Sequence, residues 1–358
     1  MNSIKLQEIL TRHDQPKFRL EQIQKAVFWD SVSTWDEITT ISKDLREILD
    51  KELVILSFAV EKILEAKNGQ SAKALLKLGD GNLIETVLIS PKPGLWSACV
   101  SCQVGCQMSC RFCATGRLGW RRDLTAEEIT DQVLFWKQYL KNKFRNLEFP
   151  LRQRISEASG IWNSDIGNIV YMGMGEPFLN WEQVRESLKI FTNKKLFGFG
   201  SRSISVSTSG IPDGIRKLAE EFPQINLAVS LHFTNDEKRN RFMSINRKYN
   251  LGELRKALGD YFQKTKRKVF IEYILLDEIN DSAVEAKKVV DYLKSVGKIH
   301  LFHVNLIRYN PTGEELKSSS GNKAQKFKNY LLRSGINATI RKSLGEEIQG
   351  ACGQLAGR

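Results

Sequence analysis

The sequence lacks any long hydrophobic run. Although 41% of its 358 residues are hydrophobic, no uninterrupted apolar stretch approaches the roughly 18 residues that a membrane-spanning helix needs. The first residues, MNSIKLQEIL, have helical periodicity and not the basic, apolar and small-residue order of a signal peptide. There is no low-complexity tract either. These absences argue against a membrane protein and predict an ordinary globular protein in the cytoplasm.

Cysteine is scarce and unevenly placed. The chain has six cysteines. All but Cys352 fall within the stretch CVSCQVGCQMSCRFC at residues 99–113. Thiols in the cytoplasm are kept reduced, so this clustering favours metal or redox chemistry over structural disulfides.

Acidic residues are too few to balance the basic ones. The 54 lysines and arginines exceed the 41 aspartates and glutamates, which gives a net charge of +13. A positive excess spread along the chain suits a polyanionic partner, most often nucleic acid. Each basic cluster alone fits a solvated helix face, and only their sum favours nucleic acid. The clusters are Arg121–Arg122, Lys141–Arg145, Arg239–Arg241, Arg247–Lys248 and Lys264–Lys268.

The N-terminal part of the chain has a helical pattern. In residues 1–66, apolar residues such as Ile4, Ile9 and Leu10 recur near the 3.6-residue period, which predicts a small helical domain. Residues 67–91 contain two apolar runs joined by Gly-Asp-Gly-Asn, which predicts a β-hairpin. The sequence PKPG at 91–94 is typical of a linker.

Strand and helix patterns alternate through residues 92–345. The first helical segment opens with a capping box at Thr125 and Glu128. Six βα units in sequence predict an α/β fold with a parallel sheet, open or partly closed into a barrel, and an active site at the C-terminal ends of the strands. Residues 141–166 form a long connection that is either a basic excursion toward a partner or a surface insertion, and residues 346–358 form a tail. The predicted strands are 95–101, 168–173, 203–208, 225–231, 268–276 and 300–307.

The cysteine cluster contains a C-x3-C-x2-C pattern. Cys106, Cys110 and Cys113 follow the first predicted strand, and three thiolates on one loop can hold three corners of a [4Fe–4S] cluster. The fourth iron then stays open to a substrate, and Phe112 can shield the cluster. The alternative is zinc or a closed cluster with Cys102 or Cys99 as the fourth ligand.

A second motif, MGMGEP at residues 172–177, ends the next predicted strand. Its glycines let the backbone approach a ligand, and Glu176 offers an acceptor to a cationic amine. Taken alone, GEP is also an ordinary strand-to-helix turn. The cysteine pattern and this loop together resemble the radical S-adenosylmethionine (SAM) superfamily, in which SAM completes the open iron.

From about residue 83 to the C-terminus the sequence is similar to the RlmN/Cfr family of radical SAM adenosine methyltransferases. The segments that carry the resemblance are CVSCQVGC, CRFCATG, YMGMGEPFLN, STSGIP, VSLH, INRKYNL, VNLIRYNP and GACGQLAG. The resemblance implies a partial (β/α)6 barrel that resembles a TIM barrel. It also implies an N-terminal helical accessory domain that binds RNA.

The family's chemistry uses a cysteine as methyl carrier, and the resemblance implies the same here. One SAM methylates Cys352, and a second SAM is split to a deoxyadenosyl radical that takes hydrogen from the S-methyl group. The carbon radical adds to adenine, Glu85 accepts the ring proton, and Cys99 releases the product by forming a transient disulfide with Cys352. Cys102 is left over and is expected to be a small buried side chain.

Further residues match the family's SAM contacts. Hydroxyl, amide and imidazole groups at strand ends suit hydrogen bonding to SAM. His13, His300 and His303 have no motif support and are interpreted as structural. The matching residues are Gly175, Glu176, Ser207, Ser230, Leu231, His232 and Asn310.

The resemblance also implies partners and leaves alternatives open. The implied substrates are 23S rRNA and tRNA, methylated at carbon 2 of adenosine, with a flavodoxin- or ferredoxin-type reductant and a monomeric enzyme. Pro177 fits the RlmN subgroup, whereas Arg308 is closer to the Cfr subgroup, which methylates carbon 8 and confers antibiotic resistance. Ser244 replaces a usual proline, and Glu346 and Glu347 replace paired aspartates. A non-catalytic RNA-binding protein with a zinc site is the alternative of another class, and metal analysis separates it from an iron protein.

One substitution tests the role of Cys99. Cys99→Ala is expected to block resolution and to trap RNA covalently on Cys352, because no second thiol can attack the carrier sulfur. The trapped species is measured as protein–RNA conjugate on a denaturing gel. Normal turnover without a conjugate would show that another group resolves the intermediate.

Overall fold

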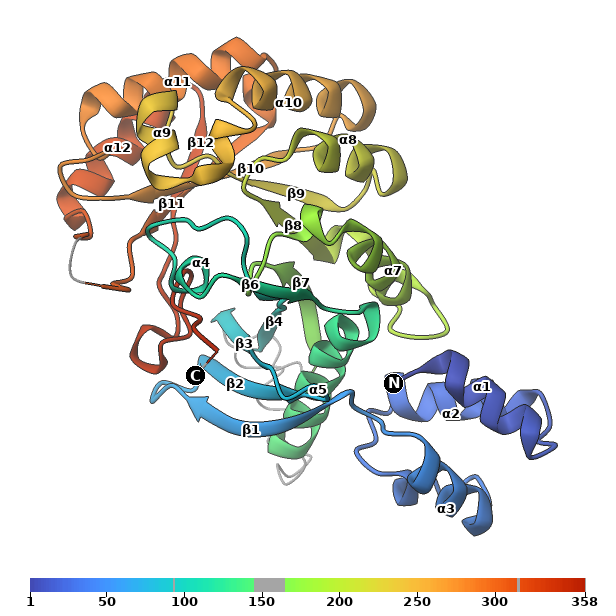
Figure 1. Cartoon of the computed structure of the whole chain (residues 1–358). Helices are drawn as coiled ribbons and strands as arrows, with labels where there is room; N and C mark the ends of the chain where they lie inside the picture. Colours follow the sequence, from blue (N-terminus) through green and yellow to red (C-terminus); the bar gives the residue numbers. More distant parts are fainter. Residues whose placement is uncertain (93, 145–164, 314–315, 358) are drawn as a thin grey trace.

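The computed structural model describes residues 1–92, 94–144, 165–313 and 316–357. Most of the connection at 141–166, with Arg145 of the basic cluster, lies outside these residues. The described strands form one sheet in the order β1-β2-β3-β4-β7-β8-β9-β10-β11-β12, and β5 pairs with β6 apart from it. Figure 1 shows the sheet with helices along its outer side and the C-terminal tail within the curve.

The parallel half of the sheet confirms the α/β prediction. All six predicted parallel strands are present, and each is parallel to the next. Their apolar runs are buried from both sides, as in Val269–Leu275, because helices cover one face and the core fills the other. The strands are β4 (Leu95–Cys99), β7 (Ile166–Tyr171), β8 (Ile204–Thr208), β9 (Asn226–Ser230), β10 (Val269–Leu275) and β11 (Phe302–Arg308).

Helices connect these strands as crossovers. The predicted capping box exists, since Glu128 N donates to Thr125 Oγ1 (3.1 Å) and Thr125 N donates to Glu128 Oε2 (2.9 Å). Within the described residues, no helix is long and apolar enough to span a bilayer. The crossover helices are α5 (Ala126–Phe144), α7 (Trp181–Thr192), α8 (Pro212–Glu221), α9 (Asp236–Phe242), α10 (Leu251–Thr265), α11 (Ala283–Val296) and α12 (Gly321–Arg333).

A short seventh parallel strand was not predicted. β12 (Asn337–Ile340) pairs with β11 through Asn305↔Thr339 and Leu306↔Ile340. It has only four residues, two of them exposed, so its sequence contains no apolar run to mark it. Its position matters because Arg341 follows it directly.

Antiparallel strands extend the sheet on the other side of β4. The predicted hairpin is confirmed as β2 (Ser71–Leu78) and β3 (Leu83–Lys92). The helical expectation is wrong for the end of residues 1–66, because β1 (Phe58–Glu65) pairs with β2 as an edge strand. Its largely exposed face gives no clean alternation, and the pairing with β2 overrides the helical pattern. The linker expected at 91–94 is a tight connection, since β4 begins at Leu95.

The first 52 residues are helical as predicted. α1 (Ser3–Arg12), α2 (Phe18–Phe28) and α3 (Lys43–Glu52) pack through buried residues such as Leu6, Ile23 and Leu49. This unit is fixed to α5, because Lys137 Nζ donates to Phe28 O (2.9 Å) and Gln138 Nε2 donates to Val32 O (2.7 Å). Figure 1 shows the three helices at one end of the molecule, away from the tail.

Helix α8 supports the GEP motif directly. The motif continues into a 3-10 helix (Pro177–Leu179), and Phe178 N donates to Glu176 Oε1 (3.2 Å). A Cβ on Gly214 of α8 would lie 2.2 Å from Phe178 Cγ, so only glycine lets the two segments pack this closely. The position of Glu176 therefore depends on the surface of α8.

We expect Gly214→Ala to destabilise the fold by about 1–3 kcal/mol, because the methyl group must displace Phe178. The measurement is the urea midpoint of unfolding. Gly259→Ala is the matched control, since Gly259 lies in α10 with open space around it. Its free energy of unfolding should rise by about 0.5–1 kcal/mol, because alanine favours the helix over glycine. Equal midpoints for the two variants would contradict the packing argument.

Candidate active site

One cavity lies at the C-terminal ends of the parallel strands, as the fold predicts. Its wall is built from the loops after β7, β8 and β9, from the cysteine loop, from Arg341 after β12, and from the C-terminal tail. The sequence-predicted residues on this wall are Cys106, Cys110, Cys113, Gly175, Glu176, Ser207, Ser230, His232 and Cys352.

The cysteine loop presents its three thiols to this cavity. Main-chain bonds hold the loop, because Cys106 N donates to Gly119 O (2.8 Å) and Cys113 N donates to Cys110 O (3.1 Å). The loop lies between β5 (Gln103–Gly105) and β6 (Trp120–Asp123), and α4 (Ala114–Arg117) follows Cys113 directly. Burial raises the pKa of Cys106 to about 12 and the pKa of Cys110 well above its ordinary value. Bound iron would reverse this preference, since a metal-coordinated thiol is deprotonated.

These residues fit an iron–sulfur cluster. Three soft sulfur donors from one loop face one cavity that continues past them. In the described part of the chain, no three histidine, cysteine or acidic side chains gather around a single point as they would around one metal ion. Cys102 is 2% exposed and packs in the core, as expected of a small buried side chain. Phe112 also lines the cavity and meets His232 edge-on, with 4.9 Å between ring centroids.

The GEP loop places a buried carboxylate beside the thiols. Glu176 is 3% exposed, its N donates to Gln103 Oε1 (2.9 Å), and its Oε2 accepts from Ser209 N (2.6 Å). Gly175 has φ +105° and would clash with Gln103 if it carried a Cβ, 2.7 Å away. Burial raises the pKa of Glu176 although these hydrogen bonds oppose the shift. A buried carboxylate at a cavity wall gains from a cationic partner such as an ammonium group.

His232 is a fixed, neutral hydrogen-bond donor. Its backbone is left-handed (φ +56°), which is uncommon outside glycine and often marks a functional position. Ile274 N donates to His232 Nδ1 (3.1 Å), so the ring proton lies on Nε2. Burial, followed by the charge of Arg239, lowers the pKa of His232 to about 3. The adjacent Leu231 is fully buried behind the wall.

The C-terminal tail is docked by residues from distant elements. Asn310 Nδ2 donates to Cys352 O (3.1 Å), Ala114 N to Gly353 O (2.7 Å), and Thr115 Oγ1 to Leu355 O (2.7 Å). In this structure Asn310, expected to contact SAM, holds the backbone of Cys352. Cys352 is thereby presented at the cavity.

Glu85 also holds the tail. This fully buried carboxylate accepts from Ala356 N (2.6 Å) and Gly357 N (3.0 Å) through Oε2, and Lys73 Nζ lies 2.6 Å from Oε1. Both oxygens are therefore engaged while the tail is docked. Although Glu85 lies on a hairpin strand, its side chain therefore faces the protein interior and not the solvent.

Cys99 and Cys352 share one cation. Burial raises the pKa of Cys99 to about 12, the neighbouring Cys352 adds to the rise, and Arg341 opposes it. Cys352 is exposed and lines the cavity. Desolvation there raises the pKa of its thiol, and Arg341 again opposes the rise. Arg341 also forms an ion pair with Glu272, with 3.3 Å between Nη1 and Oε2.

Sequence reasoning missed Arg341 and misjudged Arg239. The sequence did not point to Arg341, because it follows β12 and that short strand was not predicted. Arg239 was grouped with surface arginines, yet it is completely buried behind the cavity. The available signal was its position, since Arg239 lies on the helix that directly follows His232.

Comparison with known proteins agrees with this geometry. Residues 100–290 match the model of the radical SAM superfamily. The chain is 39% identical to the ribosomal RNA large subunit methyltransferase Cfr of Clostridium botulinum (strain Okra / Type B1), over 98% of this chain and 96% of the relative. It is 41% identical to the probable dual-specificity RNA methyltransferase RlmN of Thermotoga sp. (strain RQ2), over 95% of this chain and 91% of the relative. A radical SAM methyltransferase from Sphaerobacter thermophilus superposes with a TM-score of 0.86 at 36% identity, covering 100% of this chain and 98% of that one.

We expect iodoacetamide to alkylate Cys352 at least about tenfold faster than Cys99 near pH 8, because Cys352 is exposed and Cys99 is a buried thiol with a pKa of about 12. The measurement is peptide mass spectrometry of quenched aliquots from anaerobic holoprotein. Cys102, 2% exposed, is the internal control for an inaccessible thiol. Equal rates at Cys99 and Cys352 would contradict the geometry described above.

Proposed function

Because the chain belongs to the RlmN/Cfr family of radical SAM RNA methyltransferases, we propose that it methylates carbon 2 of an adenosine in 23S rRNA and of the adenosine beside the anticodon in tRNA. The observation that carries the proposal is that Cys352 lines the same cavity as Cys106, Cys110 and Cys113. A methyl carrier must reach the bound SAM and the target base from one position, and this cavity is where both can meet it.

The residues around the cavity take distinct roles in this proposal. Cys106, Cys110 and Cys113 hold the cluster. When bound, the cluster and SAM supply the electron and the carbon radical that this chemistry needs. Glu176 binds the SAM ammonium group, and His232 donates from Nε2 with a proton that it keeps throughout the physiological pH range. The hydroxyls of Ser207 and Ser230, and the backbone of Gly175, complete the lining.

Two thiols complete the transfer in the same proposal. Cys352 carries the methyl group as an S-methylcysteine. After the ring proton has left, the Cys99 thiolate attacks the Cys352 sulfur, the S–C bond breaks with its electron pair moving to the new exocyclic carbon, which takes a proton, and a disulfide forms. The unpaired electron that the radical addition leaves on the base would return to the oxidised cluster. Arg341 favours the thiolate form of both cysteines. A flavodoxin- or ferredoxin-type protein is the proposed electron donor.

Glu85 is the proposed acceptor of the ring proton. Its carboxylate binds two tail amides and Lys73, so it becomes available only when residues 356–357 move away. Tail displacement is accordingly part of the proposed cycle.

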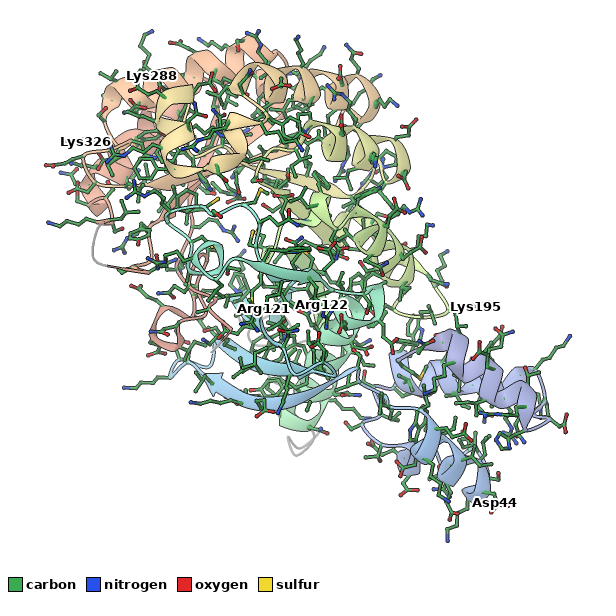
Figure 2. All side chains as sticks on the ribbon, viewed as in Figure 1. Asp44, Arg121, Arg122, Lys195, Lys288 and Lys326 are labelled. Atoms are coloured by element: carbon green, nitrogen blue, oxygen red, sulfur yellow. The ribbon has the colours of Figure 1, made fainter. Side chains whose placement is uncertain are left out.

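Surface chemistry beside the tail supports an RNA substrate. Leu118 and Trp120 are 48% and 46% exposed, and Arg121 is exposed next to them. Leu118 and Arg121 line a hollow that also contains Ala356 and Gly357 of the tail. Figure 2 shows Arg121 and Arg122 on the middle of the molecule. An exposed indole with an adjacent guanidinium is a surface on which an unpaired base can stack.

Methylation of carbon 8 is the second candidate. Arg308 at the end of β11 matches the Cfr subgroup, and the 39% identity with Cfr is close to the 41% with RlmN. Pro177, buried at the start of its 3-10 helix, matches the RlmN subgroup and favours carbon 2.

One labelling experiment tests the proposal. Anaerobically reconstituted protein, trideuteromethyl SAM and either a 23S rRNA fragment or bulk tRNA are incubated, and the digested nucleosides are compared by mass spectrometry with 2-methyladenosine and 8-methyladenosine. We expect 2-methyladenosine in both RNAs with two of the three deuterons kept, because one leaves with the abstracted hydrogen. Label at carbon 8 would assign the second candidate. Three retained deuterons would contradict the carrier chemistry.

A further inference from the structure

A buried arginine stands behind the cavity wall. Arg239 lies on α9, and it is 0% exposed. Burying a guanidinium costs several kcal/mol unless hydrogen bonds and opposite charge compensate for the lost water. The partners of Arg239 therefore indicate what its charge is for.

The hydrogen-bond partners of Arg239 are neutral. Its Nη2 donates to Ser209 O and Ser230 O, its Nε to Leu231 O (3.2 Å), and its Nη1 to Asn246 Oδ1 (2.9 Å). These acceptors satisfy the N–H groups but leave the positive charge uncancelled.

The acidic residue of the same helix is engaged elsewhere. Asp236 Oδ1 accepts from Asn246 Nδ2 (2.9 Å) and from Leu251 N (3.0 Å). Burial lowers the pKa of Arg239, and the through-space interactions that oppose this shift come, in decreasing order, from Tyr292, Cys110 and Asp236.

The charge of Arg239 faces the cysteine loop. Ser209, Ser230 and His232 line the cavity, and Arg239 holds the first two by their carbonyls from behind. The helix that carries Arg239 is joined to the cysteine loop, because Arg111 N donates to Phe242 O (3.1 Å), and the charge of Arg239 acts through space on both Cys110 and His232. Three thiolates around a [4Fe–4S] core make this site anionic, and each added electron makes it more so.

We propose that Arg239 is the internal counter-charge of the iron–sulfur cluster: it stabilises the reduced state and so raises the reduction potential at which the cluster accepts an electron. The inference rests on the cofactor of the proposed function but not on which adenine carbon is methylated. It also accounts for Asn246, which orients the guanidinium while Asp236 orients Asn246.

A purely structural role is the competing explanation, since Arg239 ties the ends of β8 and β9 to α9. Two substitutions separate the explanations. Arg239→Lys keeps the positive charge and loses the forked hydrogen bonds, whereas Arg239→Gln removes the charge and keeps a hydrogen-bond donor. Arg241→Gln is the matched control, because Arg241 is on the same helix but exposed over the Phe242 ring.

The experiment is a potentiometric titration of anaerobic holoprotein without RNA, followed by the electron paramagnetic resonance signal of the reduced cluster, with iron content measured for each variant. Arg239→Gln should lower the equilibrium constant for reduction at least about tenfold, which is about 59 mV for one electron. Arg239→Lys should stay close to wild type, and Arg241→Gln should be unchanged.

Each outcome decides the proposal. The proposal would be overturned if Arg239→Gln had the wild-type iron content and an unchanged reduction potential. It would also be overturned if the reduction potential of Arg239→Lys shifted as far as that of Arg239→Gln. If Arg239→Gln fails to assemble a cluster, a normal potential in Arg239→Lys supports the counter-charge, and failure or a shifted potential of the lysine variant overturns it. A wild-type protein that binds no iron would instead contradict the proposed function itself.

Discussion

The site depends on one set of main-chain hydrogen bonds that continues the pairing of β4 with β7 beyond the ends of both strands. Gly173 N donates to Val100 O (3.0 Å), and Met174 O accepts from Cys102 N (2.8 Å) and Gln103 N (3.2 Å). These bonds bring the cysteine loop and the GEP loop side by side, although they are far apart in the sequence. A Cβ at Gly173 would lie 2.7 Å from Val100 O, so the contact admits only glycine. The cavity, its thiols and its carboxylate all follow from this junction.

The cavity wall carries charged groups of both signs. Arg341 Nη1 lies 3.3 Å from the buried carboxylate of Glu272, and the buried Glu176 and the neutral His232 line the same cavity. Each ionised group would be costly in isolation, because a buried charge needs a partner. Such a lining suits a zwitterionic ligand whose ammonium and carboxylate ends must be told apart.

The sequence predicted the parallel strands well because their apolar runs are buried on both faces and long enough to recognise. It missed β12 and misassigned β1, since a four-residue strand and an exposed edge strand owe their structure to pairing partners, and pairing is not visible in a local pattern. The cysteine triad and Glu176 were predictable because their chemistry repeats in short motifs. The burial of Arg239 was not, because a lone arginine among other basic residues has the same local pattern on a surface helix as in a core. The tail contacts of Glu85 and Asn310 required the three-dimensional structure.

The docked tail has a consequence for RNA affinity. A tail seated on Glu85 and a free Glu85 carboxylate exclude each other, so in the proposed cycle the last residues act as a tethered competitor of the target base. Tethering gives such a competitor a high and constant effective concentration, and part of the intrinsic affinity for RNA is spent on displacing it. In the proposed cycle, the contacts that hold Cys352 at the cavity would also weaken RNA binding, and the return of the tail would favour release of the methylated product.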